Sequence, residues 1–312
     1  MADIRFDGRV AIVTGAGVGL GRAHALGLAA RGAKVVVNDL GVSTSGEGQT
    51  NVAADAVVEE IRASGGEAMS HGADVASEAQ VAAMVGTAMA TWGRIDILVN
   101  NAGILRDKTF AKMDLADFRK VIEVHLMGSA TVTHAVWPIM RAQGYGRVVM
   151  TSSASGIYGN FGQSNYGAAK MGVVGLMNVL ALEGARDNIR VNTLAPTAAT
   201  RMTENLMPPE ALDVLQPETI TPGLLYLVSE DAPTRTILGA GAGVFAQTRI
   251  YETEGVLLEG ADNTPEAVQA AFAGIQDPNG QRELTDAFAQ TKKFAGRAAE
   301  ARGLSLPWGD ST

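Results

Sequence analysis

Short runs of β-branched and other apolar residues alternate with Ala-rich stretches from Val10 onward. The runs predict strands over Val10–Val13, Lys34–Asn38, Ala68–Ala73, Ile95–Asn100, Arg147–Thr151 and Val191–Ala195. The stretches between them predict helices over Gly21–Arg31, Val52–Ala63, Glu78–Thr91, Asp114–Met140 (one helix or two) and Tyr166–Arg186. This alternation indicates an α/β class with a doubly wound parallel sheet (Rossmann) and helices on both faces. The strands lack a polar face because helices bury a parallel sheet on both sides.

The pattern changes near Arg249 to polar, Ala-rich segments. Helices are predicted over Thr264–Ile275 and Glu283–Arg302, with a Pro-Asn-Gly turn at 278–280 between them. We therefore divide the chain into a Rossmann domain, residues 1–248, and a C-terminal helical extension, residues 249–312. The extension is expected to pack on the same domain, because so short a segment does not easily form a core of its own.

Composition and charge exclude several classes of function. Apolar residues make up 46% and charged residues 19% of the 312 residues, which is ordinary for a folded domain. The net charge of −8, without a cluster of Lys and Arg, argues against nucleic-acid binding. The charged start MADIRFDGRV resembles no signal or transit peptide, and no apolar run reaches the length of about 18 residues that a membrane span needs. The absence of Cys excludes thiolate metal sites, and no carboxylate–His cluster suggests a metal. We expect a soluble, cytoplasmic protein.

A glycine-rich turn stands between the first strand and the first helix, in the segment Thr14-Gly15-Ala16-Gly17-Val18-Gly19-Leu20-Gly21. Gly15, Gly19 and Gly21, with Leu20 beside them, let the backbone approach a pyrophosphate whose charge lies at the helix N-terminus. A turn of this composition in this position favours dinucleotide binding over a simple connection.

Asp39 ends the second strand. A carboxylate there accepts hydrogen bonds from the ribose hydroxyls and repels a 2′-phosphate, which favours NAD over NADP. The alternative is that Asp39 caps the following loop. Asp74 and Val75 at the end of the third strand are candidates to meet the adenine edge.

The fourth strand ends in Asn101-Ala102-Gly103, whose small residues permit close approach of a ligand. This segment, like Asp74-Val75, is also compatible with an ordinary turn. All of these positions lie at the carboxyl ends of strands, where ligands bind in this architecture.

A candidate chemical site follows the fifth strand. Tyr166 and Lys170 are four residues apart, so they share one face of a helix. An ammonium beside a phenol stabilises the phenolate and lowers its pKa from about 10 toward neutral pH. Ser153 precedes this pair and is placed to hydrogen-bond the same substrate oxygen. The three residues predict general acid/base catalysis of alcohol oxidation while a hydride leaves to a nicotinamide.

These motifs resemble those of the short-chain dehydrogenase/reductase family in identity, order and spacing. Within that family the chain resembles the branch of (3R)-hydroxyacyl-CoA dehydrogenases found in the peroxisomal multifunctional β-oxidation enzymes of type 2. The segments that carry this second resemblance are Arg5–Arg9, Val36–Gly41, Asn101–Asp107, Ser153–Gly162, Arg201–Glu204, Gly239–Gly243 and Thr264–Val268.

The resemblance implies a role for each catalytic residue. Tyr166 is then the proton acceptor, Ser153 holds the reacting oxygen, and Lys170 binds the nicotinamide ribose while tuning Tyr166. The reaction implied is NAD-dependent oxidation of a (3R)-3-hydroxyacyl-CoA to the 3-oxoacyl-CoA, by a homodimer or homotetramer. Since the chain stops before the further domains of the multifunctional enzymes, we expect a stand-alone, bacterial form that carries only the dehydrogenase step.

The resemblance also places Pro196, Thr197 and Thr200 over the nicotinamide, after the sixth strand, and in two places the chain departs from the family pattern. Thr197 replaces the Gly that usually follows the proline. His125 stands where many members have an Asn that belongs to a proton relay, and its own role is left open.

Alternative functions remain at this point. The same chemistry could act on a hydroxysteroid, another secondary alcohol or a 3-oxoacyl thioester, and a more distant alternative is a non-catalytic NAD(H)-binding scaffold. The substrate is a small molecule, acyl-CoA or sterol-like, for which Ile157, Tyr158 and Phe161 either line a pocket or serve only in packing.

Overall fold

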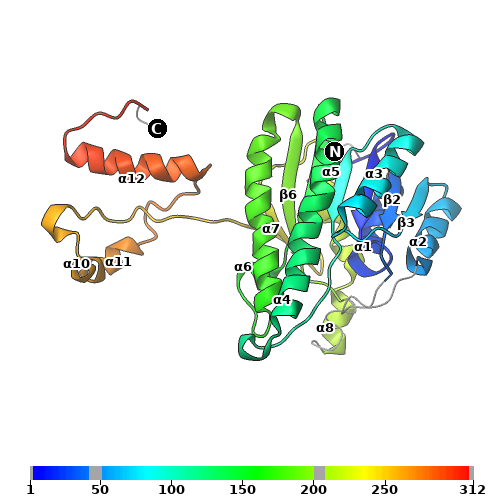
Figure 1. Ribbon diagram of the computed structural model, residues 1–312, viewed down its shortest axis with the longest axis horizontal. Helices are drawn as coiled ribbons and strands as arrows, with labels where there is room; N and C mark the ends of the chain where they lie inside the picture. The colour runs from blue at the N-terminus through cyan, green and yellow to red at the C-terminus, as the bar shows by residue number, and fades with distance from the viewer. Residues whose placement is uncertain (1–2, 42–50, 200–207, 309–312) are drawn as a thin grey trace. The chain divides into compact units, whose positions relative to one another are not determined.

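The computed structural model describes residues 3–41, 51–199 and 208–308 of the chain. Two compact units make up the chain, Met1–Thr248 and Arg249–Thr312. The described residues of the first unit form an eight-stranded sheet in the order β3-β2-β1-β4-β5-β6-β7-β8. Strands β2 and β3 lie side by side at one edge of it (Figure 1). The strands are β1 (Val10–Thr14), β2 (Lys34–Asn38), β3 (Ala68–His71), β4 (Ile97–Asn100), β5 (Gly146–Thr151), β6 (Ile189–Pro196), β7 (Ile237–Gly241) and β8 (Val244–Thr248).

Strands β1 to β7 run parallel, and only β8 runs antiparallel, paired with β7. The strand order reverses between β1 and β4, which is where an open α/β sheet forms its ligand crevice at the carboxyl ends of the strands. This arrangement confirms the α/β, doubly wound fold expected from the sequence.

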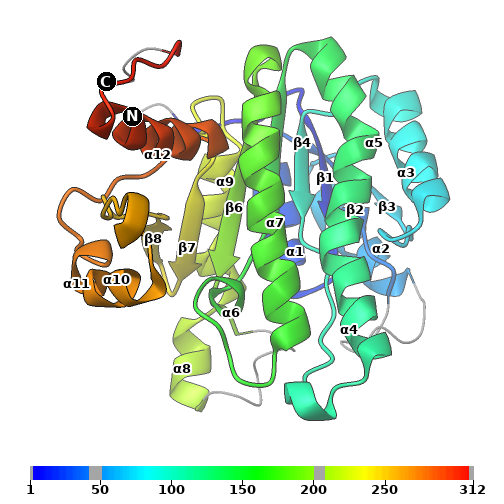
Figure 2. The same ribbon diagram turned by 60° about the vertical axis from the view of Figure 1, so that its left-hand side comes forward.

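Helices cover both faces of the sheet (Figure 2). The helices of the first unit are α1 (Gly19–Ala29), α2 (Val52–Ala63), α3 (Glu78–Trp92), α4 (Leu115–Ile122), α5 (Gly128–Gln143), α6 (Ala154–Ile157), α7 (Ser164–Glu183), α8 (Pro209–Val214) and α9 (Thr221–Leu227). Helices α1, α2 and α9 bury one apolar cluster against the sheet, and α3, α5 and α7 bury another on the opposite face. In the part of the chain that the structure describes, no helix is long and apolar enough to cross a membrane.

The structure differs from the sequence-based expectation in three elements. The helix expected over Asp114–Met140 is divided by a π-helical turn, Glu123–Met127, between α4 and α5. The first helix begins at Gly19, two residues before the expected start. Strands β7 and β8 were not expected, because Ile-Leu-Gly-Ala-Gly has few β-formers and β8 is largely exposed.

The second unit consists of short helices and irregular chain: α10 (Pro265–Ala270), α11 (Phe272–Ile275) and α12 (Ala287–Ala301). The buried ammonium of Lys293 pairs with Glu252 at 3.1 Å. Among the described residues of this unit, Ala299 is the one apolar residue that is buried, whereas Phe272 and Phe294 are more than half exposed.

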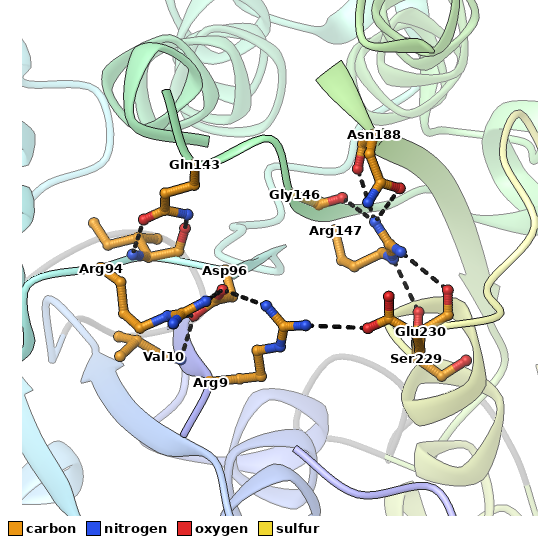
Figure 3. Close-up of polar contacts among 11 residues, drawn as sticks. Arg9, Val10, Arg94, Asp96, Gln143, Gly146, Arg147, Asn188, Ser229 and Glu230 are labelled. Carbon is orange, nitrogen blue, oxygen red and sulfur yellow. Dashed lines mark hydrogen bonds and ion pairs between the residues drawn. The ribbon is translucent and has the colours of Figure 1, made fainter. Parts of the chain in front are cut away.

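A buried ionic cluster holds the amino ends of β1, β4 and β5 together (Figure 3). Asp96, which has no exposed surface, accepts hydrogen bonds from the Val10 backbone N–H at 2.9 Å, from Arg9 at 3.0 Å and from Arg94 at 2.8 and 2.6 Å. Both of its carboxylate oxygens are therefore paired, as a buried charge requires.

Arg147, in β5, is the largest fully buried side chain of this cluster. Its guanidinium donates to the backbone carbonyls of Gly146, Asn188, Ser229 and Glu230 at 2.8 to 3.0 Å. These bonds link β5 to the chain segments before β6 and after α9, far from the carboxyl ends of the strands.

Candidate active site

The glycine turn after β1 requires glycine for steric reasons. Gly15 has φ +63°, and a Cβ on it would lie 2.8 Å from the Cα of Ala102. A Cβ on Gly21 would lie 2.1 Å from the carbonyl oxygen of Gly15. Helix α1 then begins at Gly19, itself at φ +55°, without a side-chain cap. No capping side chain accepts hydrogen bonds from the backbone N–H groups in the first turn of α1. Such N–H groups at a helix N-terminus commonly bind phosphate.

Asn101 and Ala102 hold this turn in place from β4. The Asn101 side-chain amide donates to the carbonyls of Thr14 and Gly15, both at 3.0 Å. The backbone N–H groups of Asn101 and Ala102 donate to the Thr14 hydroxyl at 3.0 and 3.1 Å. Gly103 has a steric reason of its own, since a Cβ there would lie 2.2 Å from the His125 ring.

Asp39 and Asp74 both accept hydrogen bonds from nearby backbone. Asp39 Oδ2 accepts from Gly17 N at 2.7 Å, and its Oδ1 accepts from Gly41 N at 2.7 Å. The loop-capping alternative therefore describes Asp39 in this structure, although a carboxylate has further lone pairs for ribose hydroxyls. Asp74 Oδ1 accepts from Ala76 N at 2.9 Å, and Val75 beside it is buried.

Ser153, Tyr166 and Lys170 come together where β5 ends and α7 begins. Ser153 is the N-cap of α6, and its hydroxyl lies near enough to the Tyr166 side chain to lower the pKa of the phenol. Lys170 is buried, and its ammonium lies 5.5 Å from the centre of the Tyr166 ring. That ammonium donates to the carbonyl of Thr151 at 2.6 Å.

The protonation of this site corrects one expectation. Burial raises the pKa of Tyr166 to about 12, despite the hydrogen bond from Ser153 that lowers it. Burial also lowers the pKa of Lys170 to about 7. The expected lowering of the tyrosine pKa by the lysine is therefore wrong for the free protein, because desolvation dominates and the ammonium is directed at Thr151.

His125 lies beside Tyr166, on the π-helical turn. The two rings make an edge-to-face contact with centroids 5.1 Å apart. His125 Nε2 lies 2.8 Å from Ile104 O and 3.1 Å from Ile104 N, and its Nδ1 is buried without a partner among the described residues. Burial lowers the pKa of His125 well below its usual range, so the ring is neutral.

Pro196 and Thr197 follow at the end of β6. Pro196 is the last residue of the strand, and Thr197 N donates to Ala240 O at 2.8 Å, which extends the pairing with β7. Thr200 and the segment Arg201–Glu204 lie outside the described residues.

An open cleft of about 330 Å³ lies beside Ser153. Its lining residues come from α6 and β6 with the residue after each, from the residue after α8, and from the β7–β8 hairpin: Ala154, Ile157, Tyr158, Ala195, Thr197, Leu215, Gly239, Ala240, Gly241, Val244, Ala246 and Thr248. Two of the three candidate pocket residues, Ile157 and Tyr158, thus line it. Phe161 is not among them and is 90% exposed. Sequence reasoning missed the hairpin residues of the cleft, because they are small and apolar and because strands β7 and β8 were not expected.

Over the described ranges, no group of three or more acidic or His residues is arranged to hold a metal.

Comparison with known proteins agrees with these features. The sequence profile of the short chain dehydrogenase family matches residues 9–211. The chain belongs to this family. Family members are oxidoreductases that use a nicotinamide dinucleotide cofactor and act on small molecules, so this short-chain dehydrogenase is an oxidoreductase of that type.

One curated relative of this short-chain dehydrogenase is about twice its length, and another is similar to it in length. It is 46% identical over 307 residues to peroxisomal multifunctional enzyme type 2 of Drosophila melanogaster, covering 97% of this chain and 49% of the relative. It is 47% identical over 275 residues to a putative short-chain type dehydrogenase/reductase of Mycobacterium tuberculosis, covering 88% of this chain and 96% of that one. The chain thus spans about half the length of its multifunctional relative, and the first match confirms the resemblance to that enzyme type.

Solved structures show the same relations. The structure of full-length peroxisomal multifunctional enzyme type 2 from Drosophila melanogaster matches with a TM-score of 0.80 and 39% identity, over 96% of this chain and 50% of that chain. A 7α-hydroxysteroid dehydrogenase complexed with NADH and 7-oxo glycochenodeoxycholic acid matches with a TM-score of 0.70 and 32% identity, over 78% of this short-chain dehydrogenase and 98% of that chain.

Proposed function

We propose that this short-chain dehydrogenase oxidises a (3R)-3-hydroxyacyl-CoA to the 3-oxoacyl-CoA with NAD⁺. The observation that carries the proposal is the convergence of Ser153, Tyr166 and Lys170 between an uncapped glycine turn and an apolar cleft. The similarity to peroxisomal multifunctional enzyme type 2 supports the choice of an acyl thioester.

The geometry suits proton transfer from a secondary alcohol. Ser153 lies near enough to Tyr166 to lower the pKa of its phenol, so both hydroxyls can engage one substrate oxygen. Tyr166 accepts the hydroxyl proton of the substrate as the carbon–oxygen double bond forms. The transfer requires Tyr166 as a phenolate, whereas burial holds its pKa near 12 in the free protein. We therefore propose that the charge of Lys170 stabilises the phenolate only in the complex with the cofactor.

The glycine turn fits a dinucleotide pyrophosphate, since helix α1 begins there without a side-chain cap on its first backbone N–H groups. A nicotinamide dinucleotide bound there accepts the hydride that leaves the substrate carbon. We propose that Gly19, Leu20, Asn101, Ala102 and Gly103 also serve this site.

The remaining cofactor contacts are also proposals. Asp74 and Val75 would meet the adenine, whereas Pro196, Thr197 and Thr200 would lie near the nicotinamide. Lys170 would bind the nicotinamide ribose in addition to its role beside Tyr166.

We propose NAD rather than NADP because of Asp39. Its carboxylate accepts hydrogen bonds from Gly17 and Gly41, and its negative charge would repel a 2′-phosphate. Replacement of Asp39 by Ala should lower the ratio of kcat/KM with NAD⁺ to kcat/KM with NADP⁺. An unchanged ratio would show that the ribose is recognised elsewhere.

A second candidate substrate is a hydroxysteroid. The observation that favours it is the fold similarity to the 7α-hydroxysteroid dehydrogenase, whose structure holds an oxidised bile-acid conjugate. A cofactor-binding scaffold without turnover is disfavoured, since a binder needs neither a buried Lys170 nor Ser153 paired with Tyr166.

The decisive assay follows NADH formation from (3R)- and (3S)-3-hydroxyacyl-CoA, each with NAD⁺ and with NADP⁺. Turnover of the R isomer with NAD⁺ is expected. If neither isomer is oxidised but hydroxysteroids are, the proposed substrate is a hydroxysteroid and not an acyl thioester. Cofactor binding without turnover across a broad alcohol panel would favour the scaffold.

We propose that the unit 249–312 packs on the dehydrogenase domain, because it buries so little apolar surface by itself. Deletion of this unit should impair activity on acyl-CoA, and full activity of a chain ending at Thr248 would contradict a role in the substrate pocket. Assembly as a dimer or tetramer and a location in the cytoplasm stay predictions.

A further inference from the structure

The cleft beside Ser153 lies on one defined face of the β7–β8 hairpin. Register pairs Gly239 with Ala246 and Gly241 with Val244, so these four residues project toward the same side of the sheet. Thr248, two residues after Ala246, completes the row. We call these five residues the glycine face, and all of them line the cleft.

The opposite face of the hairpin is packed against a helix. Leu238 and Phe245 lie on that side, and a Cβ on Gly223 of α9 would be 2.7 Å from the Phe245 ring and 3.1 Å from the Leu238 side chain. The hairpin is therefore anchored through one face, and the absence of side chains at Gly239 and Gly241 hollows the other.

The cleft has the chemistry of an apolar tail site. No charged side chain is among the described residues that line it, so it offers nothing to the phosphates of a CoA moiety. Two of the three hydroxyls that line it, those of Tyr158 and Thr248, hydrogen-bond each other at 3.0 Å. This bond joins the chain after α6 to β8 across the cleft.

One end of the cleft borders helix α6, which begins directly after Ser153. Ala154 and Ile157 of α6 line it, and Ser153 is the N-cap of that same helix. Thr197, after β6, lines it as well. A substrate whose oxygen is held by Ser153 therefore has this cleft within reach of the carbon chain attached to its reacting carbon.

We propose that the cleft holds the acyl chain of the 3-hydroxyacyl thioester, extended along the glycine face, and that Gly239 and Ala246 determine the length of chain accepted. This inference rests on the proposed function and specifies its substrate. A row of small side chains along two antiparallel strands forms a narrow, extended floor, which suits an unbranched chain better than a fused ring system.

The test fills the cleft at Gly239. This residue does not have positive φ, and an added Cβ would meet only Ala246 O at 3.4 Å, so a side chain there fits without backbone strain. Gly241 is less suitable, because its Cβ would lie 2.9 Å from Thr197 O. Gly239→Val and the milder Gly239→Ala are therefore the chosen variants.

The measurement is kcat/KM for (3R)-3-hydroxybutyryl-, 3-hydroxyoctanoyl- and 3-hydroxyhexadecanoyl-CoA. Gly239→Val should lower the ratio of kcat/KM for the hexadecanoyl substrate to kcat/KM for the butyryl substrate by about tenfold or more. The reason is that each methylene group excluded from an apolar pocket lowers kcat/KM by about that factor. Gly239→Ala should lower it less, and Val244→Ala, which widens the cleft, should not lower it.

Gly86→Val on α3 is the matched control, since a Cβ there meets no atom within 4 Å, and it should leave the ratio unchanged. Thermal unfolding of each variant checks that the fold is retained. An unchanged chain-length profile in folded Gly239→Val, with the wild type active on all three thioesters, would overturn the acyl cleft and leave the proposed function standing. A wild type inactive on every acyl-CoA would overturn both.

Discussion

At the amino end of the sheet, Asp96 and Arg147 are fully buried and each has several hydrogen-bond partners (Figure 3). At the carboxyl end, Lys170 is just as buried, yet its ammonium is directed at one backbone carbonyl. His125 Nδ1 and Thr151 Oγ1 nearby have no partner among the described residues. The same sheet thus pairs its buried polar groups at one end and leaves several unpaired at the other.

This difference follows from what each end does. Buried charges stabilise a fold only when their partners are complete, as around Asp96. A site that must bind a cofactor and move a proton keeps groups whose partners arrive with the ligand, at a cost in stability. The amino end is therefore expected to govern folding and the carboxyl end to govern chemistry.

The largest expected effect is on turnover, at the carboxyl end. Tyr166→Phe removes the proton acceptor and should lower kcat by about 10²–10⁴-fold while NADH binding, measured by fluorescence titration, is retained. Tyr226→Phe, at a half-exposed tyrosine of α9, is the matched control and should keep the wild-type rate. A near-wild-type rate in Tyr166→Phe would remove the acid/base assignment.

At the amino end, Asp96→Asn should reduce the free energy of unfolding by about 1.5–3 kcal/mol, because the partly exposed Arg9 and Arg94 lose the charged partner of their hydrogen bonds. Urea unfolding measures this difference. Asp7→Asn breaks an exposed ion pair with Arg5 and should have a far smaller effect. If the two variants unfold alike, the buried cluster does not carry the stability assigned to it.

Ser153→Ala should shift the pH dependence of oxidation. The hydrogen bond from Ser153 lowers the pKa of Tyr166, so its loss raises that pKa and moves the rising limb of the kcat/KM profile to higher pH. Ser155→Ala is the control. If the rising limb of the kcat/KM profile of Ser153→Ala lies at the same pH as that of the wild type, another group controls the rate in that pH range.

Lys170 should make the stability of the folded protein depend on pH. Its pKa is lowered to about 7 in the folded protein from 10.5, so between these values the unfolded chain binds the extra proton and stability increases with pH. Lys170→Met lacks this contribution. The free energy of unfolding is measured for both proteins near pH 7 and near pH 10. From the lower to the higher pH, that of the wild type should increase more than that of Lys170→Met. If the difference between the two proteins is the same at both pH values, the depressed pKa is contradicted.

Much of the candidate site could be predicted because its signals are local. The turn at Gly15 is visible in sequence since positive φ and close backbone approach select glycine. Tyr166 and Lys170 share a face because a helix repeats every three to four residues. The protonation of this pair could not be predicted, since desolvation depends on everything packed around it.

The position of His125 illustrates the same limit. His125 stands where many members of the family have Asn, which marks the position in the sequence. Its edge-to-face contact with Tyr166 and its hydrogen bond to Ile104 depend, however, on a π-helical turn inside an otherwise α-helical stretch. No local pattern distinguishes that turn from the continuous helix expected over Asp114–Met140.

The sequence by itself determined the order of β1 to β6 and of the long helices between them, the glycine turn, and the prediction that Ser153, Tyr166 and Lys170 carry the chemistry, since periodicity and residue type act over a few positions. Only the tertiary structure decided which buried groups are paired and that Gly239 and Gly241 form the floor of a cleft. Those properties arise from segments far apart in the chain, as where β7 meets α6 and where Arg9 meets Asp96. Their contacts exist only once the sheet is assembled.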